Sequence, residues 1–148
     1  MKTVNDILRT KGNVVWSVSP NTTVLEALKL MAEKDIGAVM VIDMGKLVGI
    51  FSERDYARRV VLEGKASKDT SVEQVMSRKV LFISPEQTTD HCMMLMTDKR
   101  VRHLPVLTEN EKLLGVISIG DVVKAIISEQ EYVIEQLERY ITGTGYGM

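Results

Sequence analysis

The stretch GIFSERD (49–55) occurs again, with small changes, as GVISIGD (115–121). Both copies keep a glycine, a serine three residues later and an aspartate three residues after that. An apolar run that ends in Ser-x-x-Asp and is followed by apolar positions at helical spacing predicts a β-strand leading straight into an α-helix. The chain therefore carries the same strand-to-helix junction twice.

The similarity extends beyond the junction, since SPNTT (19–23) matches SPEQT (84–88) and VNDIL (4–8) matches VEQVM (72–76). These matches predict two repeats, residues 3–64 and 72–128, joined by a linker at 65–71 and followed by a C-terminal helix and tail at 129–148. A repeat of this size does not bury its apolar face alone. We therefore expect the two copies to close on each other as a pseudo-twofold pair.

Each repeat shows the same order of helix, strand, strand and helix. The first helix has apolar residues at helical spacing, followed by short strands at 38–42 and 47–51, or at 104–107 and 113–117. A second helix is predicted to start at Asp55 and at Asp121. The predicted fold class is α/β, with two pseudo-symmetric repeats that each contain a small β-sheet and two helices, packed as one module.

The C-terminal segment SEQEYVIEQLERYITG (128–143) predicts an amphipathic helix with Val133, Leu137 and Tyr140 on one side. Two interpretations are open for this stripe: packing on a partner subunit, or folding back on its own chain. GTGYGM (143–148) is predicted to be a frayed tail.

Composition excludes several classes of protein. The 148 residues have a formal net charge of −1, which gives no basic field for nucleic acid. No apolar run approaches the roughly 20 residues of a membrane helix, and no signal peptide is expected at the N-terminus. The single cysteine, Cys92, rules out an internal disulfide and fits a reducing compartment, so a cytoplasmic protein is expected. Two histidines and one cysteine supply no metal-ligand set, and no catalytic constellation is present, so we expect neither a metal nor an enzyme.

The Ser-x-x-Asp junction has two interpretations from its residues. It is typical of a capping box, in which the serine hydroxyl accepts a backbone N–H of the helix and the aspartate complements the helix dipole. The same groups suit a sugar-phosphate, with the carboxylate on ribose hydroxyls and the amides near phosphate. Gly49 and Gly115 within the strands indicate close approach of a ligand or of another backbone.

The repeats resemble the CBS domain, and residues 3–128 resemble a stand-alone tandem pair of such domains. The segments GIFSERDYARRVVLEGKASKDTSVEQVMS (49–77), MTDKRVRHLPVL (96–107) and LLGVISIGDVVKAII (113–127) carry the resemblance. It implies a regulatory module whose clefts between the repeats bind AMP, NAD(H) or ATP. It also implies a homodimer that transmits the state of its ligand to a client protein of unknown identity. A non-sensing interaction or scaffold module with degenerate clefts is the alternative.

The resemblance also implies the site residues. In the family, the serine and aspartate contact phosphate and ribose, which places these roles on Ser52, Asp55, Ser118 and Asp121. The stronger predicted cleft uses Asp121 and Ser118 with Thr22, Ile36 and Gly37, and Arg102 and His103 reach into it. The second cleft uses Asp55 and Ser52, with Arg54 close by. Ala38, Val116 and Ile117 are further residues that we assign to the nucleotide sites. Arg102 and His103 supply cationic or donor groups for phosphate, unless they form only a solvated strand entry with local charge pairs.

Overall fold

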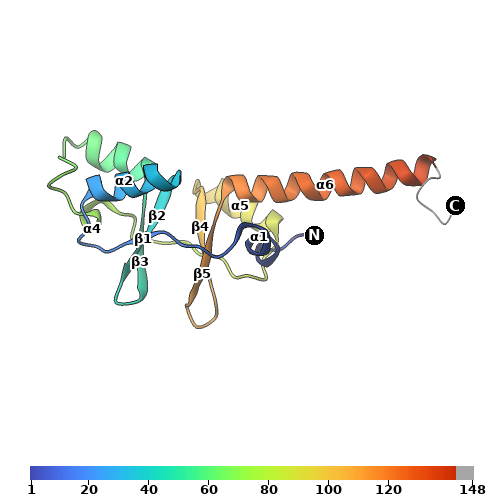
Figure 1. Cartoon of the computed structure of the whole chain (residues 1–148), viewed down its shortest axis with the longest axis horizontal. Helices are drawn as coiled ribbons and strands as arrows, with labels where there is room; N and C mark the ends of the chain where they lie inside the picture. The colour runs from blue at the N-terminus through green and yellow to red at the C-terminus, as the bar shows by residue number, and fades with distance from the viewer. Residues whose placement is uncertain (143–148) are drawn as a thin grey trace. The chain divides into compact units, whose positions relative to one another are not determined.

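The computed structural model describes residues 1–142 and divides the chain into two compact units (Figure 1). The first unit comprises residues 14–81, and the second comprises residues 1–13 together with the chain from residue 82 onward. The predicted tail at 143–148 lies outside the described residues. None of the helices within residues 1–142 has the length and apolar character needed to cross a membrane.

The first unit is built on a three-stranded sheet in the order β1 (Ser17–Val18), β2 (Ala38–Asp43) and β3 (Lys46–Ser52). β1 pairs parallel to β2, and β2 pairs antiparallel to β3. The helical elements are α2 (Val24–Lys34), α3 (Glu53–Asp55), its continuation as a π-helix η1 (Tyr56–Val61), and α4 (Val72–Val75). Their inward side chains form one core: Val24, Ala27, Met31, Val39, Val41, Phe51, Val60, Val72, Val75 and Met76.

The second unit repeats this plan with β4 (His103–Leu107) antiparallel to β5 (Leu113–Ser118). Ile83 forms a parallel bridge with Val106 in the place that β1 holds in the first unit. The helices are α1 (Val4–Lys11), α5 (Thr89–Lys99) and α6 (Ile119–Thr142). The predicted α/β class, with two similar units of small sheets and helices, is confirmed.

α2 and α5, which are the predicted first helices of the two repeats, are capped at both ends. Thr23 and Thr88 each accept a backbone N–H of the first turn with their side chains. Each helix ends at a residue in the left-handed conformation, Asp35 or Arg100. The apolar stripe predicted for α2 and α5 faces the core, and Cys92 is fully buried on it.

The helix that opens each repeat packs in the unit formed by the other repeat. α1 opens the first repeat, yet Val4 donates its backbone N–H to the Gln87 carbonyl at 2.8 Å. α4 opens the second repeat, and Val72 donates to the Thr22 carbonyl at 2.8 Å. The two bonds are equivalent under the repeat, so the exchange is reciprocal. The boundaries of the compact units therefore differ from the predicted boundaries of the sequence repeats. The repeat boundaries stay a prediction.

The exchanged helices explain the two strand glycines. A Cβ at Gly49 would lie 2.5 Å from Met76 Sδ and 3.0 Å from the Ser77 carbonyl oxygen, while a Cβ at Gly115 would lie 2.8 Å from Leu8 Cδ2. Real Cβ atoms essentially never come closer than 3.0 Å to another atom, and a distance of 3.0 Å is itself tighter than most real contacts. Of the two readings of these glycines, close approach of the protein's own chain is the one observed within the described residues.

The two glycines should differ in their tolerance of alanine. In Gly49→Ala the new methyl meets a backbone carbonyl that cannot rotate away, so we expect a loss of about 1–3 kcal/mol in the free energy of unfolding. Gly115→Ala should lose less, because the Leu8 side chain can change rotamer. Urea denaturation would measure both.

Gly120→Ala is the matched control for these variants. The nearest atom to its Cβ is Ser118 Oγ at 3.6 Å, and the residue lies in a helix. Alanine there should stabilise the chain by about 0.5–1 kcal/mol. Equal losses at Gly49 and Gly115 would contradict the distinction between a rigid and a mobile neighbour.

Candidate functional site at the strand-to-helix junctions

Both Ser-x-x-Asp motifs form capping boxes. Ser52 N–H donates to Asp55 Oδ2 at 2.9 Å, and Asp55 N–H donates to Ser52 Oγ at 3.2 Å. Ser118 N–H donates to Asp121 Oδ2 at 2.8 Å, with the return bond at 3.2 Å. The helices consequently begin at Glu53 and Ile119, two residues before the predicted starts at Asp55 and Asp121, because the serine itself is the N-cap.

Each junction also holds the entry to the first long strand of its unit. Ala38 pairs with Ser52 across β2 and β3, and Gly37 accepts the Glu53 N–H at 3.0 Å. In the second unit His103 pairs with Ser118, and the Arg102 carbonyl accepts the Ile119 N–H at 2.8 Å. The structure therefore brings Gly37 and Ala38 to the Asp55 junction.

Arg102 and His103 lie at the Asp121 junction in the same way. Arg102 is exposed and His103 is half-buried. The two positions that distinguish the repeats in sequence thus border the motif in both units.

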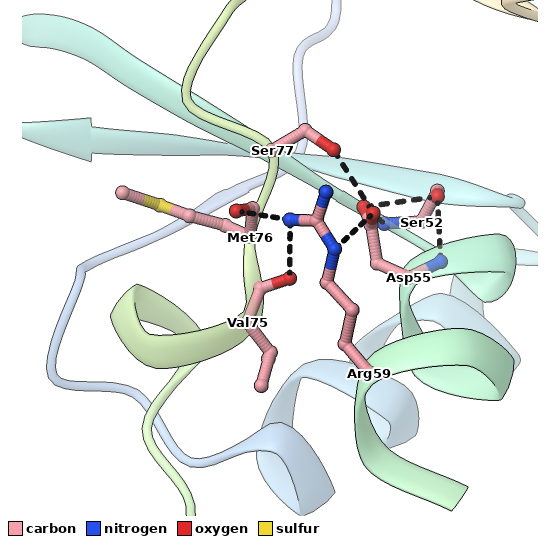
Figure 2. A network of polar contacts seen from close by, with 6 residues as sticks. All are labelled: Ser52, Asp55, Arg59, Val75, Met76 and Ser77. Atoms are coloured by element: carbon pink, nitrogen blue, oxygen red, sulfur yellow. Dashed lines mark hydrogen bonds and ion pairs between the residues drawn. The ribbon is translucent and has the colours of Figure 1, made fainter. Parts of the chain in front are cut away.

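Asp55 is held inside the first unit by a network of polar contacts (Figure 2). Its Oδ1 accepts the Ser77 hydroxyl at 2.9 Å and lies 4.0 Å from Arg59 Nε. Arg59 also donates through Nη1 to the carbonyls of Met76, at 2.9 Å, and Val75, at 3.4 Å, at the end of α4. Asp55 is only 7% exposed. The carboxylate therefore ties the exchanged helix α4 to the first unit.

Asp121 has a different partner. Lys11, the last residue of α1, places Nζ 2.6 Å from Asp121 Oδ2 and 2.7 Å from the Val116 carbonyl oxygen. Burial alone would raise the pKa of the Asp121 carboxyl, but the hydrogen bonds from Lys11 and Ser118 and the Lys11 charge together lower it below its ordinary value. Asp121 is thus an ionised, partly exposed carboxylate whose cationic partner comes from a long side chain.

His103 completes the electrostatics of this junction. Burial lowers the pKa of its imidazole, the Lys11 charge lowers it further, and Arg102 adds to the same effect while Asp121 opposes it. The side chain is therefore neutral near pH 7 and can donate one N–H and accept at its other nitrogen. With His103 neutral, the junction has two positive charges, on Lys11 and Arg102, and one negative charge, on Asp121. These three side chains together therefore carry a net charge of about +1.

An open hollow of about 530 Å³ lies beside the Asp55 network in the first unit. It borders the end of α4, and none of the residues predicted for the nucleotide sites lines it. Its lining is Arg59, Glu73, Gln74, Met76, Ser77, Arg78 and Lys79. Within the described part of the chain, no group of three or more acidic, histidine or cysteine side chains could hold a metal ion.

The remaining predicted residues divide between the units. Thr22 belongs to the first unit and bonds the Ser19 N–H through its hydroxyl at 3.2 Å, while Ile36 packs against the core of that unit. Arg54 is exposed on α3, next to the capping box. In the second unit Ile117 is fully buried. The assignment of these residues to nucleotide sites stays a prediction.

Sequence reasoning missed Lys11, Ser77 and Arg59, which provide the partners of the two aspartates. The signal lay in the echo of VNDIL (4–8) by VEQVM (72–76), because the residues that follow each copy reach the junction of the other repeat.

Comparison with known proteins identifies the repeats. The family model of the CBS domain matches residues 4–62 and 72–128. A curated relative, the mitochondrial CBS domain-containing protein CBSX3 of Arabidopsis thaliana, is 36% identical over 97% of this chain and 73% of its own length. The chain is also similar to a solved structure of a protein with CBS domains from Burkholderia ambifaria, at 51% identity and a TM-score of 0.83, over 87% of this chain and 96% of the other.

A more distant structural neighbour shows the same fold. The CBS domain pair of protein MJ0100 is 23% identical, with a TM-score of 0.77 over 87% of this chain and 98% of the other. That protein was solved in complex with 5′-methylthioadenosine and S-adenosyl-L-methionine.

The pKa of His103 generates a prediction for the pH dependence of stability. A histidine whose folded pKa lies below its unfolded value binds fewer protons in the native state. The free energy of unfolding should therefore fall as the pH drops below about 6.5. In His103→Gln this fall should be shallower, as measured by urea denaturation between pH 5 and pH 8. His91→Gln, on the exposed side of α5, is the control, and a wild-type pH dependence in His103→Gln would refute the assignment.

Proposed function

This chain belongs to the CBS-domain family, with two copies of the domain, and on that premise we propose that it senses an adenosyl nucleotide. It binds AMP or NAD(H), with ATP as a further candidate, and passes the state of the ligand to a client protein. It is a regulatory module and not an enzyme. The adenosyl ligands of MJ0100, a protein of the same fold, support the class of ligand.

The observation that carries the proposal is the state of Asp121. Its carboxylate is ionised, partly exposed and held by a lysine side chain that can move. An ionised carboxylate accepts the two hydroxyls of a ribose, and Lys11, Arg102 and His103 supply donors for phosphate. The predicted Asp121 site, with Ser118, Val116 and Ile117 from the same strand end, is therefore our first site.

The Asp55 junction ranks second. Asp55 is buried, and its partner Ser77 is fixed by backbone hydrogen bonds, so occupation by a ligand would require more rearrangement. Ser52 and Arg54 belong to this second site, with Ala38 at the strand entry.

A scaffold or interaction module remains the alternative function, because a specific observation favours it. The capping boxes account for both Ser-x-x-Asp motifs without any ligand. A scaffold would show no change in melting temperature with any adenine nucleotide, whereas a ligand that binds only the native state raises it.

The proposal includes assembly and location. Along α6, residues 130–142 are exposed, and Val133, Leu137 and Tyr140 form an apolar stripe on the part of the helix that extends past α1 and α5 in Figure 1. We place it on a partner subunit in a homodimer, because a stripe of this kind is covered in most proteins. A cytoplasmic location, with no nucleic-acid or membrane partner, fits the charge and the single free Cys92.

Ligand binding is tested by two matched variants. Asp121→Ala should weaken AMP binding by about one to two orders of magnitude, because a charged acceptor of the ribose hydroxyls is lost. It should cost about 0.5–2 kcal/mol of stability through the weakened cap. Asp55→Ala should have the smaller effect on affinity at the first site and the larger effect on stability. Calorimetric titration of AMP and NADH, with urea denaturation of each variant, measures both quantities, and unchanged affinity in a folded Asp121→Ala would make the aspartate a cap only.

Assembly is tested by truncation after Glu129. This end point keeps the bonds that Glu129 makes to the N-terminal amine, at 3.2 Å, and to Lys2 N–H, at 3.2 Å. Removal of residues 130–148 should weaken the dimer in sedimentation velocity, while AMP affinity per subunit stays within about threefold because no site residue is lost. A full-length chain that sediments as a monomer would refute the dimer, and an unaffected dimer would refute the role of α6.

A further inference from the structure

Each junction presents the same two acceptors. One is the aspartate carboxylate, and the other is the strand carbonyl two residues before the serine, Ile50 in the first unit and Val116 in the second. In the first unit Ser77 satisfies both: its backbone N–H donates to the Ile50 carbonyl at 2.8 Å and its hydroxyl donates to Asp55 at 2.9 Å.

In the second unit one ammonium group satisfies both acceptors. Lys11 Nζ donates to the Val116 carbonyl at 2.7 Å and to Asp121 at 2.6 Å. Ser77 uses its backbone N–H for the strand carbonyl, whereas Lys11 uses its side chain, and this difference follows from the different lengths of α4 and α1. α4 ends at Val75, and Met76 is extended, so Ser77 runs along the edge of β3; α1 continues to Lys11, which reaches back with its side chain.

The two junctions differ in how freely the group bound to the aspartate can move away from it. Ser77 and Ile50 exchange two backbone hydrogen bonds, at 2.8 and 3.0 Å, so the Ser77 backbone stays on the Ile50 carbonyl, and only its neutral hydroxyl can rotate away from Asp55. The Lys11 ammonium lies at the end of a flexible four-carbon side chain, which is 37% exposed. It can rotate away from Asp121 with the backbone of α1 unchanged, and the charge it carries then needs an anion.

We propose that Lys11 determines the ligand specificity of the Asp121 site, as a deepening of the proposed function on which it rests. In the unliganded chain Lys11 neutralises Asp121. When the ribose hydroxyls bind the carboxylate, the ammonium turns to the 5′-phosphate of the ligand. The site therefore selects adenosyl ligands that are anionic at the 5′ position over neutral ones, and selects most strongly against a 5′-sulfonium, whose positive charge adds to those of Lys11 and Arg102.

Three probes of one scaffold separate these charges: AMP, 5′-methylthioadenosine and S-adenosyl-L-methionine. Calorimetry on the 148-residue chain should give the tightest Kd for AMP and the weakest for S-adenosyl-L-methionine. In Lys11→Gln the Kd for AMP should rise about tenfold or more, as expected for a lost charge-assisted hydrogen bond. The Kd values of the other two ligands should stay the same or fall, because Asp121 is released.

Two further variants keep the test decisive. Lys11→Arg retains the charge and should retain the wild-type order of ligands. Arg9→Gln removes an exposed charge from the same helix, where Arg9 pairs with Asp6 at 3.4 Å, and should leave all three Kd values within about twofold.

The outcomes distinguish the two proposals. Equal changes in all three Kd values in Lys11→Gln, or loss of the ligand order in Lys11→Arg, would overturn the role of Lys11 while the binding function stands. A wild-type chain that binds none of the three probes would overturn the proposed function, and the role of Lys11 with it.

Discussion

The rest of the structure depends on the close approach of an exchanged helix to a strand that has a glycine at the point of contact. At Gly49 the approaching residues are Met76 and Ser77, and at Gly115 the approaching residue is Leu8. A larger residue would hold the exchanged segment away from the strand edge. The approach completes the core of each unit, and it also delivers Ser77 and Lys11 to the two aspartates. Packing and site chemistry therefore have one cause.

The two junctions share the same backbone arrangement but differ in the side chain that contacts the aspartate. Both serines cap a helix, both aspartates accept the serine N–H, and both strand entries pair with the serine. What differs is the group that completes the aspartate's hydrogen bonds, a neutral hydroxyl in one unit and an ammonium in the other. A duplicated motif can in this way keep one copy as a fixed structural joint and the other as a site that responds to a ligand.

The four long strands β2 to β5, the α2 and α5 helices and the capping boxes could be predicted from sequence, because their signals are local, whereas the two-residue strand β1 was not predicted. Thr23 and Thr88 mark helix starts, and β-branched runs mark strands. The partner of each aspartate could not be predicted in this way. Lys11 and Asp121 are 110 residues apart, and their contact depends on α1 running two turns where α4 runs one. The length of a short helix is set by tertiary packing, which no local pattern encodes.

The capping and ligand-binding interpretations of Ser-x-x-Asp are compatible at Asp121. The Ser118 N–H and the Lys11 ammonium both bond to Asp121 Oδ2. A carboxylate has about four acceptor positions on its two oxygens. Ribose hydroxyls can therefore take Oδ1 and the position that Lys11 vacates while Ser118 N–H stays on Oδ2. In the proposed exchange the start of α6 persists in both states, and the change on binding is confined to the Lys11 side chain. At Asp55 the Ser77 hydroxyl already occupies Oδ1. That hydroxyl could leave only by rotation about the Ser77 Cα–Cβ bond, and it carries no charge that would then need an anion from a ligand.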